Sequence, residues 1–223
     1  MTYFGEGAAS EGDFHPALNF AATLRAQTLF FCRNNMYAIS TPIDDQYAGD
    51  GIAVRGPSYG MHTIRVDGND IFAVYSATQK AREFIIKEKR PVLLESISYR
   101  VGDHSTSDFS QRYRDEKEMK KWNDLLGKFG NPIERFEKYL LRRGLITEDR
   151  PKKLREDAIE QVRTALKTST AELLPEPDVL FTQVYDEMTD NLVEQREELR
   201  EHLKKWPNDY NLEKFVNGKH YQS

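Results

Sequence analysis

The chain has 223 residues, of which 39% are hydrophobic and 11% aromatic, a composition typical of a globular protein with a sizeable core. Its formal net charge of -4 argues against a nucleic-acid-binding surface, which needs clustered basic side chains. No apolar run approaches the ~20 residues that a membrane-spanning helix needs, so we expect neither nucleic acid nor a membrane as a partner. The single cysteine, Cys32, cannot form an internal disulfide and indicates a reducing compartment.

The first residues have the pattern of a strand end, because Tyr3 and Phe4 lead directly into the glycine turn of residues 5–7. No charged or Arg/Ser-rich leader follows Met1. Since a strand this short has lost its front end, we expect the chain to be either the C-terminal part of a longer protein or the product of a truncated gene model.

Strand and helix patterns alternate from residue 1 to about residue 103. Such alternation favours a parallel sheet with right-handed crossovers, and therefore an α/β fold. Asp70 is a suitable N-cap for the second helix, and Pro91 ends it. The expected elements are a helix over 17–24, a strand over 28–32, a Gly-, Pro-, Asp- and Ser-rich loop over 37–60, a strand over 62–66, a helix over 70–85 and a strand over 92–97.

Helical spacing continues from Glu116 to the end of the chain, with Gly144 as a C-cap and a last, highly charged helix over 191–205. We therefore predict two regions. Residues 1–115 form an α/β domain that ends in a loop over 100–115, and residues 116–223 form a helical C-terminal region.

Polar residues follow two of the expected strands, at the edge where ligands bind in open α/β sheets. Gly5-Glu6-Gly7 follows one strand and Arg33-Asn34-Asn35 the next. A helix starting near Ser10 or Glu11 would point its N-terminus at the same place and favour an anion. Carboxylate, amide and carbonyl oxygens suit Mg²⁺, which completes its shell with phosphate oxygens. The pattern predicts a site for a diphosphate with its metal, although the same residues could form only a strand-to-helix turn and a loop entry.

Several segments resemble the α subunits of the thiamine-diphosphate-dependent 2-oxo acid dehydrogenases. These are GEGAASEGD, NFAATL, FFCRNNMYAISTP, QYAGDGIAVRGPSYG, IRVDGND and YRVGDHSTSDFSQRYR. The chain is most similar to the branched-chain members, over essentially its whole length but over only the latter half or so of a typical α subunit. The resemblance implies an N-terminally truncated thiamine-diphosphate-binding fold with a parallel sheet, followed by a helical region.

The resemblance also implies the ligands of a magnesium ion. Glu6 matches the acidic ligand, Asn35 the amide ligand, and Tyr37 the residue whose backbone carbonyl completes the set. Met36 departs from the family, which commonly has glycine there.

Contacts with the cofactor are implied in the same way. Gly7 and Ala8 match positions whose backbone touches the diphosphate, and Arg33 matches a diphosphate-binding arginine. His104 matches a catalytic histidine that lies over the cofactor and helps acyl transfer. By itself, a histidine in a polar loop is more typical of an exposed side chain.

Ser105 matches an inhibitory phosphorylation site, and Asp115 stands where the family has a second one. A phosphate at Ser105 would place nearly two negative charges beside His104 and disorder the loop. Four residues are candidates to hold the loop in its ordered form: Arg100, Asp108, Tyr113 and Arg114.

The function implied by the resemblance is oxidative decarboxylation of branched-chain 2-oxo acids, with acyl transfer to lipoyl-lysine, in branched-chain amino acid catabolism. The implied cofactors are thiamine diphosphate and Mg²⁺. The implied partners are a β subunit in an α2β2 heterotetramer, a lipoyl-bearing dihydrolipoyl acyltransferase, and a regulatory kinase and phosphatase in the mitochondrial matrix. We expect the isolated chain to be inactive.

Two alternatives remain open from the sequence. Pyruvate dehydrogenase α subunits tend to have YGMG where this chain has YAIS, and HSMSDPG where it has HSTSD. Both differences favour the branched-chain interpretation. The other alternative is a non-catalytic assembly protein that keeps only this half.

Overall fold

The computed structural model describes residues 1–129 and 131–222 and divides into two compact units, Met1–Thr147 and Glu148–Ser223. The boundary predicted after residue 115 lies inside the first of these units. Each unit is described separately below.

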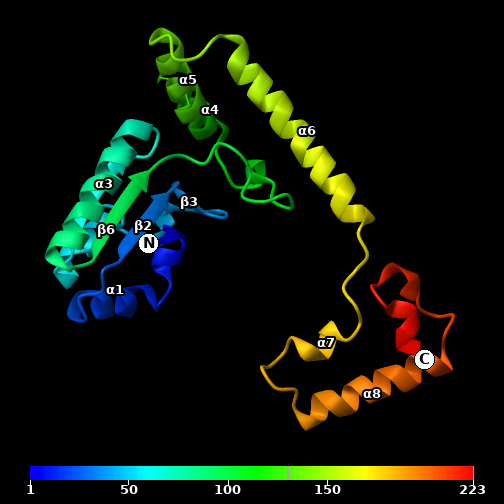
Figure 1. Ribbon diagram of the computed structural model, residues 1–223. Helices are drawn as coiled ribbons and strands as arrows, with labels where there is room; N and C mark the ends of the chain where they lie inside the picture. Colours follow the sequence, from blue (N-terminus) through cyan, green and yellow to red (C-terminus); the bar gives the residue numbers. More distant parts are fainter. Residues whose placement is uncertain (130, 223) are drawn as a thin grey trace. The chain divides into compact units, whose positions relative to one another are not determined.

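A four-stranded parallel sheet forms the centre of the first unit (Figure 1). Its order is β1 (Thr2–Gly5), β2 (Leu29–Asn34), β6 (Val92–Ile97) and β5 (His62–Asp67). All three pairings are parallel. The alternation of strands and helices predicted from the sequence is therefore confirmed, and with it the α/β fold class.

A hydrophobic cluster covers each face of the sheet. Successive residues of a strand point to opposite sides, so Leu93 and Leu94 of β6 belong to different clusters. On one face, Leu93 packs in a cluster with residues of α1 (Phe14–Thr23) and of the segment over 50–61. On the other face, Leu94 packs against α3 (Ile71–Glu88). Asp70 caps α3 as predicted, since its carboxylate accepts hydrogen bonds from the first turn of the helix.

The prediction that a helix starts near Ser10 or Glu11 is wrong. The short 3₁₀ helix η1 (Ala8–Ser10) follows β1, and Glu11 then adopts an extended backbone with φ -71° and ψ 150°. A helical hydrogen-bond ladder cannot continue through an extended residue, so α1 begins only at Phe14. A compact turn, and not the N-terminus of an α-helix, therefore follows β1.

The segment predicted as a long loop over 37–60 is more structured than the sequence indicated. It contains two short antiparallel strands, a single helical turn and two 3₁₀ helices. These elements are β3 (Tyr37–Ala38), β4 (Thr41–Pro42), α2 (Ile43–Gln46), η2 (Ala53–Arg55) and η3 (Pro57–Tyr59).

The first unit continues with η4 (Ser110–Arg112), α4 (Glu116–Phe129) and α5 (Pro132–Arg142). Helix α5 is fastened to the start of α3, because Arg135 forms ion pairs with Asp67 and Asp70 at 3.4 and 3.2 Å. Gly144 has a left-handed φ of 64°, which fits the C-cap predicted there.

The second unit consists of helices: α6 (Asp149–Ala171), α7 (Val179–Thr182), α8 (Asp190–Lys205), η5 (Leu212–Lys214) and η6 (Gly218–Gln222). Its small core includes four buried apolar residues: Phe181, Leu192, Leu203 and Leu212. Helix α6 buries no side chain and leaves apolar residues such as Val162 and Leu166 60% exposed. Among the described residues, the structure has no helix both long and apolar enough to span a membrane.

Candidate functional site

Glu6 and Asn35 lie together at the carboxyl edge of the sheet. Because β1 and β2 are parallel neighbours with Gly5 opposite Arg33, the turns that follow them meet. The side chain of Glu6 is buried, with 1% of the residue exposed, and its Oε2 accepts a hydrogen bond from the backbone N–H of Asn35 at 3.0 Å. The structure thus brings together the acid and the amide residue that the sequence singled out.

The turn after β2 is built from side-chain contacts to its own backbone. Asn34 Oδ1 accepts from the N–H of Met36 at 3.0 Å, and Asn35 Oδ1 accepts from the N–H of Tyr37 at 3.2 Å. Met36 adopts a left-handed φ of 72° between them. The backbone carbonyl of Tyr37, the third oxygen of the expected set, is 3.5 Å from Nη1 of Arg100.

The donor set of this edge fits a divalent cation. Glu6 Oε1 is buried and has no hydrogen-bond partner among the described residues, an arrangement that is costly unless a ligand compensates it. The Oδ1 of Asn35 has a second lone pair beside the one directed at Tyr37. Within the described ranges no group of three or more His, Cys, Asp or Glu side chains could hold a metal. Glu6, Asn35 and the carbonyl of Tyr37 would offer a carboxylate, an amide and a backbone oxygen, which suit a hard cation.

The residues expected to contact the diphosphate lie near the same edge of the sheet, with Gly7 and Ala8 after β1 and Arg33 near the end of β2. A Cβ atom on Gly7 would lie 2.7 Å from Cβ of Ala38, so a glycine is needed for β3 to approach the turn after β1. Ala8 and Arg33 are both exposed.

Arg55 stabilises the turn after β1, a role that was not predicted from the sequence. Its Nη1 donates to the carbonyl of Ala9 at 2.5 Å, and its guanidinium lies over the rings of Tyr47 and Phe14, 5.0 and 5.8 Å from their centroids. The conformation of residues 8–10 is therefore fixed by a residue more than forty positions away in the chain.

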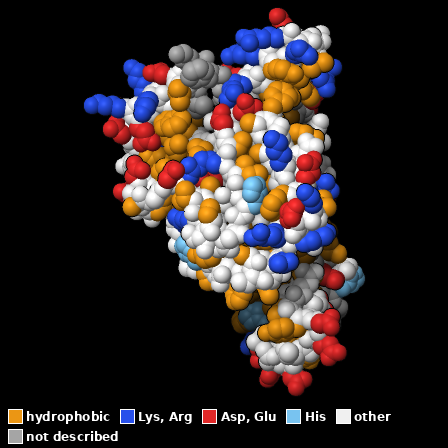
Figure 2. Space-filling model, turned by 90° about the vertical axis from the view of Figure 1, so that its left-hand side faces the viewer, with side chains coloured by type: hydrophobic (Ala, Val, Ile, Leu, Met, Phe, Trp, Pro, Cys, Tyr) orange, Lys and Arg blue, Asp and Glu red, His pale blue; other side chains and the backbone are white. Residues whose placement is uncertain are grey.

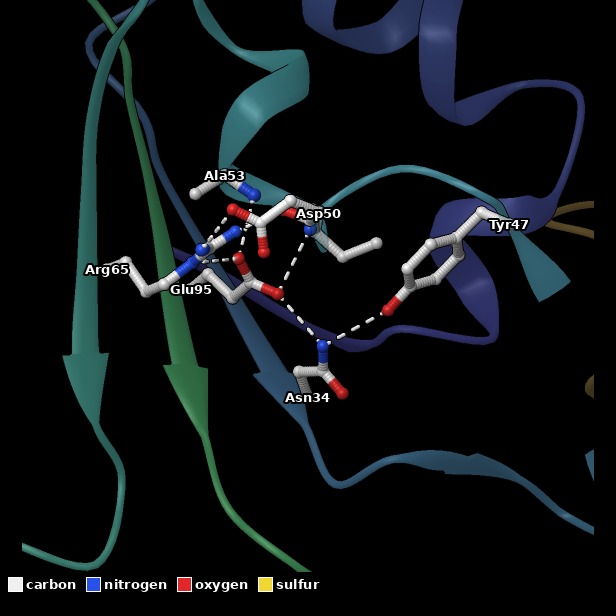
Figure 3. A network of polar contacts seen from close by, with 7 residues as sticks. Asn34, Tyr47, Asp50, Ala53, Arg65 and Glu95 are labelled. Atoms are coloured by element: carbon white, nitrogen blue, oxygen red, sulfur yellow. Dashed lines mark hydrogen bonds and ion pairs between the residues drawn. The ribbon is translucent and has the colours of Figure 1, made fainter. Parts of the chain in front are cut away.

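Glu95 is a second buried carboxylate, on the central strand β6, and the sequence reasoning also missed it (Figure 3). Its Oε1 accepts from Asn34 Nδ2 at 2.8 Å and from the N–H of Ile52 at 3.0 Å. Its Oε2 accepts from the N–H of Ala53 at 2.8 Å and from Arg65 Nε at 3.0 Å. The available signal was an acid inside the apolar run over 92–97, which predicts a buried strand.

The loop over 100–115 is held by a chain of hydrogen bonds. Asp108 Oδ2 accepts from the N–H of His104 at 2.8 Å and from the hydroxyl of Tyr113 at 2.6 Å. Arg100 Nη2 donates to the same hydroxyl at 2.8 Å and to the carbonyl of Ile39 at 2.6 Å. The hydroxyl of Tyr113 lowers the pKa of Asp108 from its usual value. The loop is therefore tied to the turn that carries the candidate metal ligands.

His104 and Ser105 are both exposed on this loop. The hydroxyl of Ser105 lies 3.3 Å from that of Ser107. Asp103 contacts Ser110, whose hydroxyl and N–H donate to the carboxylate and lower its pKa.

Tyr37 also connects the turn to the start of α4. Its hydroxyl donates to Glu118 Oε2 at 2.7 Å. The buried guanidinium of Arg114 lies 4.8 Å from the centroid of Tyr37 and 5.5 Å from that of Tyr99. Burial raises the pKa of Tyr37 and that of Tyr99, the latter to about 12.

The fold and this edge together define an α/β protein with a candidate metal site of mixed oxygen ligands, next to an ordered polar loop. The pattern of the dehydrogenase E1 component family matches residues 1–178. The chain belongs to this family. The resemblance to 2-oxo acid dehydrogenase α subunits that was expected from the sequence is confirmed.

The curated relatives carry a more specific name. A protein of Dictyostelium discoideum named 2-oxoisovalerate dehydrogenase subunit alpha, mitochondrial, is 52% identical over 98% of this chain and 49% of its own length. The human protein of the same name is 49% identical over 96% of this chain and 47% of its own length. An Arabidopsis thaliana protein, subunit alpha 2, is 45% identical over 94% and 44%. The chain spans about half the length of the curated relatives it matches.

Proposed function

We propose that this chain acts within the α subunit of a branched-chain 2-oxo acid dehydrogenase. The observation that carries the proposal is the contact between Glu6 and Asn35, which leaves a buried carboxylate oxygen without a donor where a cation would bind. The similarity to proteins named 2-oxoisovalerate dehydrogenase subunit alpha gives the substrate class, a branched-chain 2-oxo acid. The names favour this assignment over pyruvate dehydrogenase.

The residues of the edge have distinct roles toward the cofactor. Glu6, Asn35 and the carbonyl of Tyr37 hold Mg²⁺. Arg33 and the backbone of Gly7 and Ala8 bind the diphosphate. When bound, thiamine diphosphate supplies the electron sink that decarboxylation needs. The protein contributes fixed positions for the metal and the diphosphate, so that the cofactor is oriented before substrate arrives.

The loop over 100–115 has a role in acyl transfer and in its regulation. His104 is the group that assists transfer of the acyl unit to a lipoyl-lysine, because an imidazole ring has one nitrogen that accepts a proton and one that donates it. Ser105 is the phosphorylation site that switches the loop. Its exposure and its place one residue after His104 support this assignment.

The partners are a β subunit in an α2β2 assembly, a lipoyl-bearing dihydrolipoyl acyltransferase, and a kinase and phosphatase that act on the loop. The location is mitochondrial, as in the names of the relatives. Exposed apolar side chains support a partner subunit. They include those of α6, and Figure 2 shows hydrophobic side chains among the charged ones on one face of the molecule.

The test measures cofactor binding and substrate choice in two forms, each in complex with a β subunit. One form is this chain, and the other is a chimera in which the preceding residues of the Dictyostelium discoideum relative stand ahead of this chain. Calorimetry should show thiamine diphosphate binding that depends on Mg²⁺, and decarboxylation should have a higher kcat/KM for 2-oxoisovalerate than for pyruvate. Absence of Mg²⁺-dependent binding in both forms would overturn the site, and a preference for pyruvate would overturn the substrate class.

A further inference from the structure

The buried carboxylate of Glu95 and the turn that carries the candidate metal ligands are joined through one side chain, Asn34 (Figure 3). We propose that Glu95 is a positioning residue for the metal site. Through the Asn34 amide it holds Met36 in its left-handed conformation, which presents Asn35 Oδ1 and the Tyr37 carbonyl to the cation. This inference rests on the proposed function, because it concerns the same site.

The neighbours of the Asn34 amide fix its orientation. A carboxylate can only accept hydrogen bonds, so the side of the amide that faces Glu95 must be the nitrogen, at 2.8 Å. The amide oxygen is therefore directed at the N–H of Met36, 3.0 Å away. Nδ2 of Asn34 also donates to the hydroxyl of Tyr47 at 3.2 Å. With only 3% of Asn34 exposed, water does not offer an alternative partner.

The turn after β2 contains a strained residue, Met36. Met36 has a φ of 72°, a region in which a residue with a Cβ atom is strained. The hydrogen bond from its N–H to Asn34 Oδ1 compensates this strain. If the amide turned over, its NH₂ group would face the N–H of Met36, and the left-handed conformation would lose its support.

The carboxylate of Glu95 is itself held in place by several donors. Its other donors come from two separate segments, the backbone of Ile52 and Ala53 and the side chain of Arg65 on β5. The backbone of Gly51, which has a φ of 77°, lies close to the carboxylate of Glu95. A Cβ atom at position 51 would lie 2.7 Å from Oε1 of Glu95. These donors fix the position of the Glu95 carboxylate, and the carboxylate in turn fixes the orientation of the Asn34 amide.

The substitution Glu95→Gln tests the proposal without changing the size of the side chain. The oxygen of the new amide should stay with the guanidinium of Arg65, because a charged donor makes the stronger hydrogen bond. The NH₂ group then faces Asn34 and turns the Asn34 amide over. The assembled complex is titrated with Mn²⁺ as the probe in the presence of thiamine diphosphate, and bound metal is measured by electron paramagnetic resonance. We expect Mn²⁺ affinity to fall about tenfold, which matches the cost of an unsupported left-handed residue.

Two further variants separate positioning from a general role in the fold. Asn34→Ala removes the link but leaves Glu95 its three other donors, and we expect the same loss of Mn²⁺ affinity. Met36→Gly removes the backbone strain, so Glu95→Gln combined with Met36→Gly should recover most of the affinity. A general loss of stability would not be rescued at Met36.

The matched control is Asp50→Asn. Asp50 has an exposed side chain and pairs with Arg65 at 2.9 Å, at the outer end of the same network, without touching Asn34. We expect the Mn²⁺ affinity of Asp50→Asn to equal that of the wild type.

Unchanged affinity in Glu95→Gln or Asn34→Ala, or no recovery with Met36→Gly, would overturn the positioning role. If Glu95→Gln does not assemble, Asn34→Ala decides. A wild-type complex that binds no Mn²⁺ would overturn the proposed function itself.

Discussion

The carboxylate of Glu6 accepts a hydrogen bond from the backbone N–H of Asn35 at 3.0 Å, and this contact joins the ends of two neighbouring parallel strands. Only one of the two carboxylate oxygens is used in it, since Oε1 has no partner among the described residues. The position of Glu6 therefore depends on the sheet, and the position of Asn35, its proposed partner in metal binding, depends on the turn after β2.

The substitution Glu6→Gln should weaken cation binding at nearly constant shape, because its oxygen can still accept from the N–H of Asn35. It replaces the proposed charged ligand by a neutral amide, and the loss of a charge-assisted interaction should lower the Mg²⁺-dependent affinity for thiamine diphosphate on the order of 100-fold. Calorimetry on the assembled complex measures the affinity. Glu11→Gln is the matched control, because Glu11 is exposed in the same segment and should have no effect. Equal affinities for the two variants would remove Glu6 from the ligand set.

The sequence predicted the sheet well, because the evidence for strands is local. The apolar runs over 28–32 and 92–97 suit strands that are covered on both faces, and the structure has β2 and β6 there. Asp70 predicted the start of α3, and Gly144 predicted the end of the helix before it, α5. Both predictions were possible because capping depends on the nearest residues.

The parts that the sequence did not predict depend on distant residues. An acid at position 95 looks like an exception within an apolar strand until Asn34 and Arg65 are seen to face it. The start of α1 was misplaced because nothing local requires Glu11 to be extended. The contacts of Arg55 with Ala9 are likewise non-local. The proximity of Glu6 and Asn35 was expected, in contrast, because it follows from the order of two strands alone.

The hydrogen bond between Tyr37 and Glu118 should stabilise the first unit. Tyr37→Phe removes a donor to a carboxylate at 2.7 Å but keeps the ring that packs beside Arg114. We expect the free energy of unfolding to fall by about 1 kcal/mol, measured by urea denaturation. Tyr75→Phe is the control, because Tyr75 is 70% exposed and its change should be within a few tenths. A loss no larger than that of Tyr75→Phe would contradict the prediction.

The loop over 100–115 should loosen in acid because of Asp108. The folded pKa of this carboxyl lies below its usual value of 3.8, chiefly because the hydroxyl of Tyr113 donates to it, and next because the N–H of His104 does. A lowered pKa means that the stabilisation is complete above the usual value and is lost as the pH falls through the folded value. Hydrogen exchange at the amide of His104 should therefore show protection above about pH 4 and lose it below.

Tyr113→Phe checks the cause. Without the phenolic hydroxyl, the pKa of Asp108 should move up toward 3.8, and protection of the His104 amide should be lost at a higher pH than in the wild type. Tyr3→Phe serves as the control, because Tyr3 is 70% exposed on β1. An unchanged pH profile in Tyr113→Phe would show that another group sets the pKa of Asp108.

The substitution Ser105→Glu should imitate the proposed phosphorylation. It adds a negative charge beside the backbone of His104, whose N–H is held by the carboxylate of Asp108, so repulsion between the two acids weakens that hydrogen bond. We expect faster hydrogen exchange over 100–115 and a loss of acyl transfer to a lipoyl domain of about tenfold or more, with Mg²⁺-dependent cofactor binding retained. The magnitude corresponds to the loss of about one charge-assisted hydrogen bond.

Ser105→Gln separates charge from size, because glutamine has the shape of glutamate without its charge. This variant should keep most of the transfer activity. Equal losses in the two variants would mean that bulk at position 105 blocks the reaction and that charge is not the switch. Full transfer activity in Ser105→Glu would remove Ser105 from the regulation of this site.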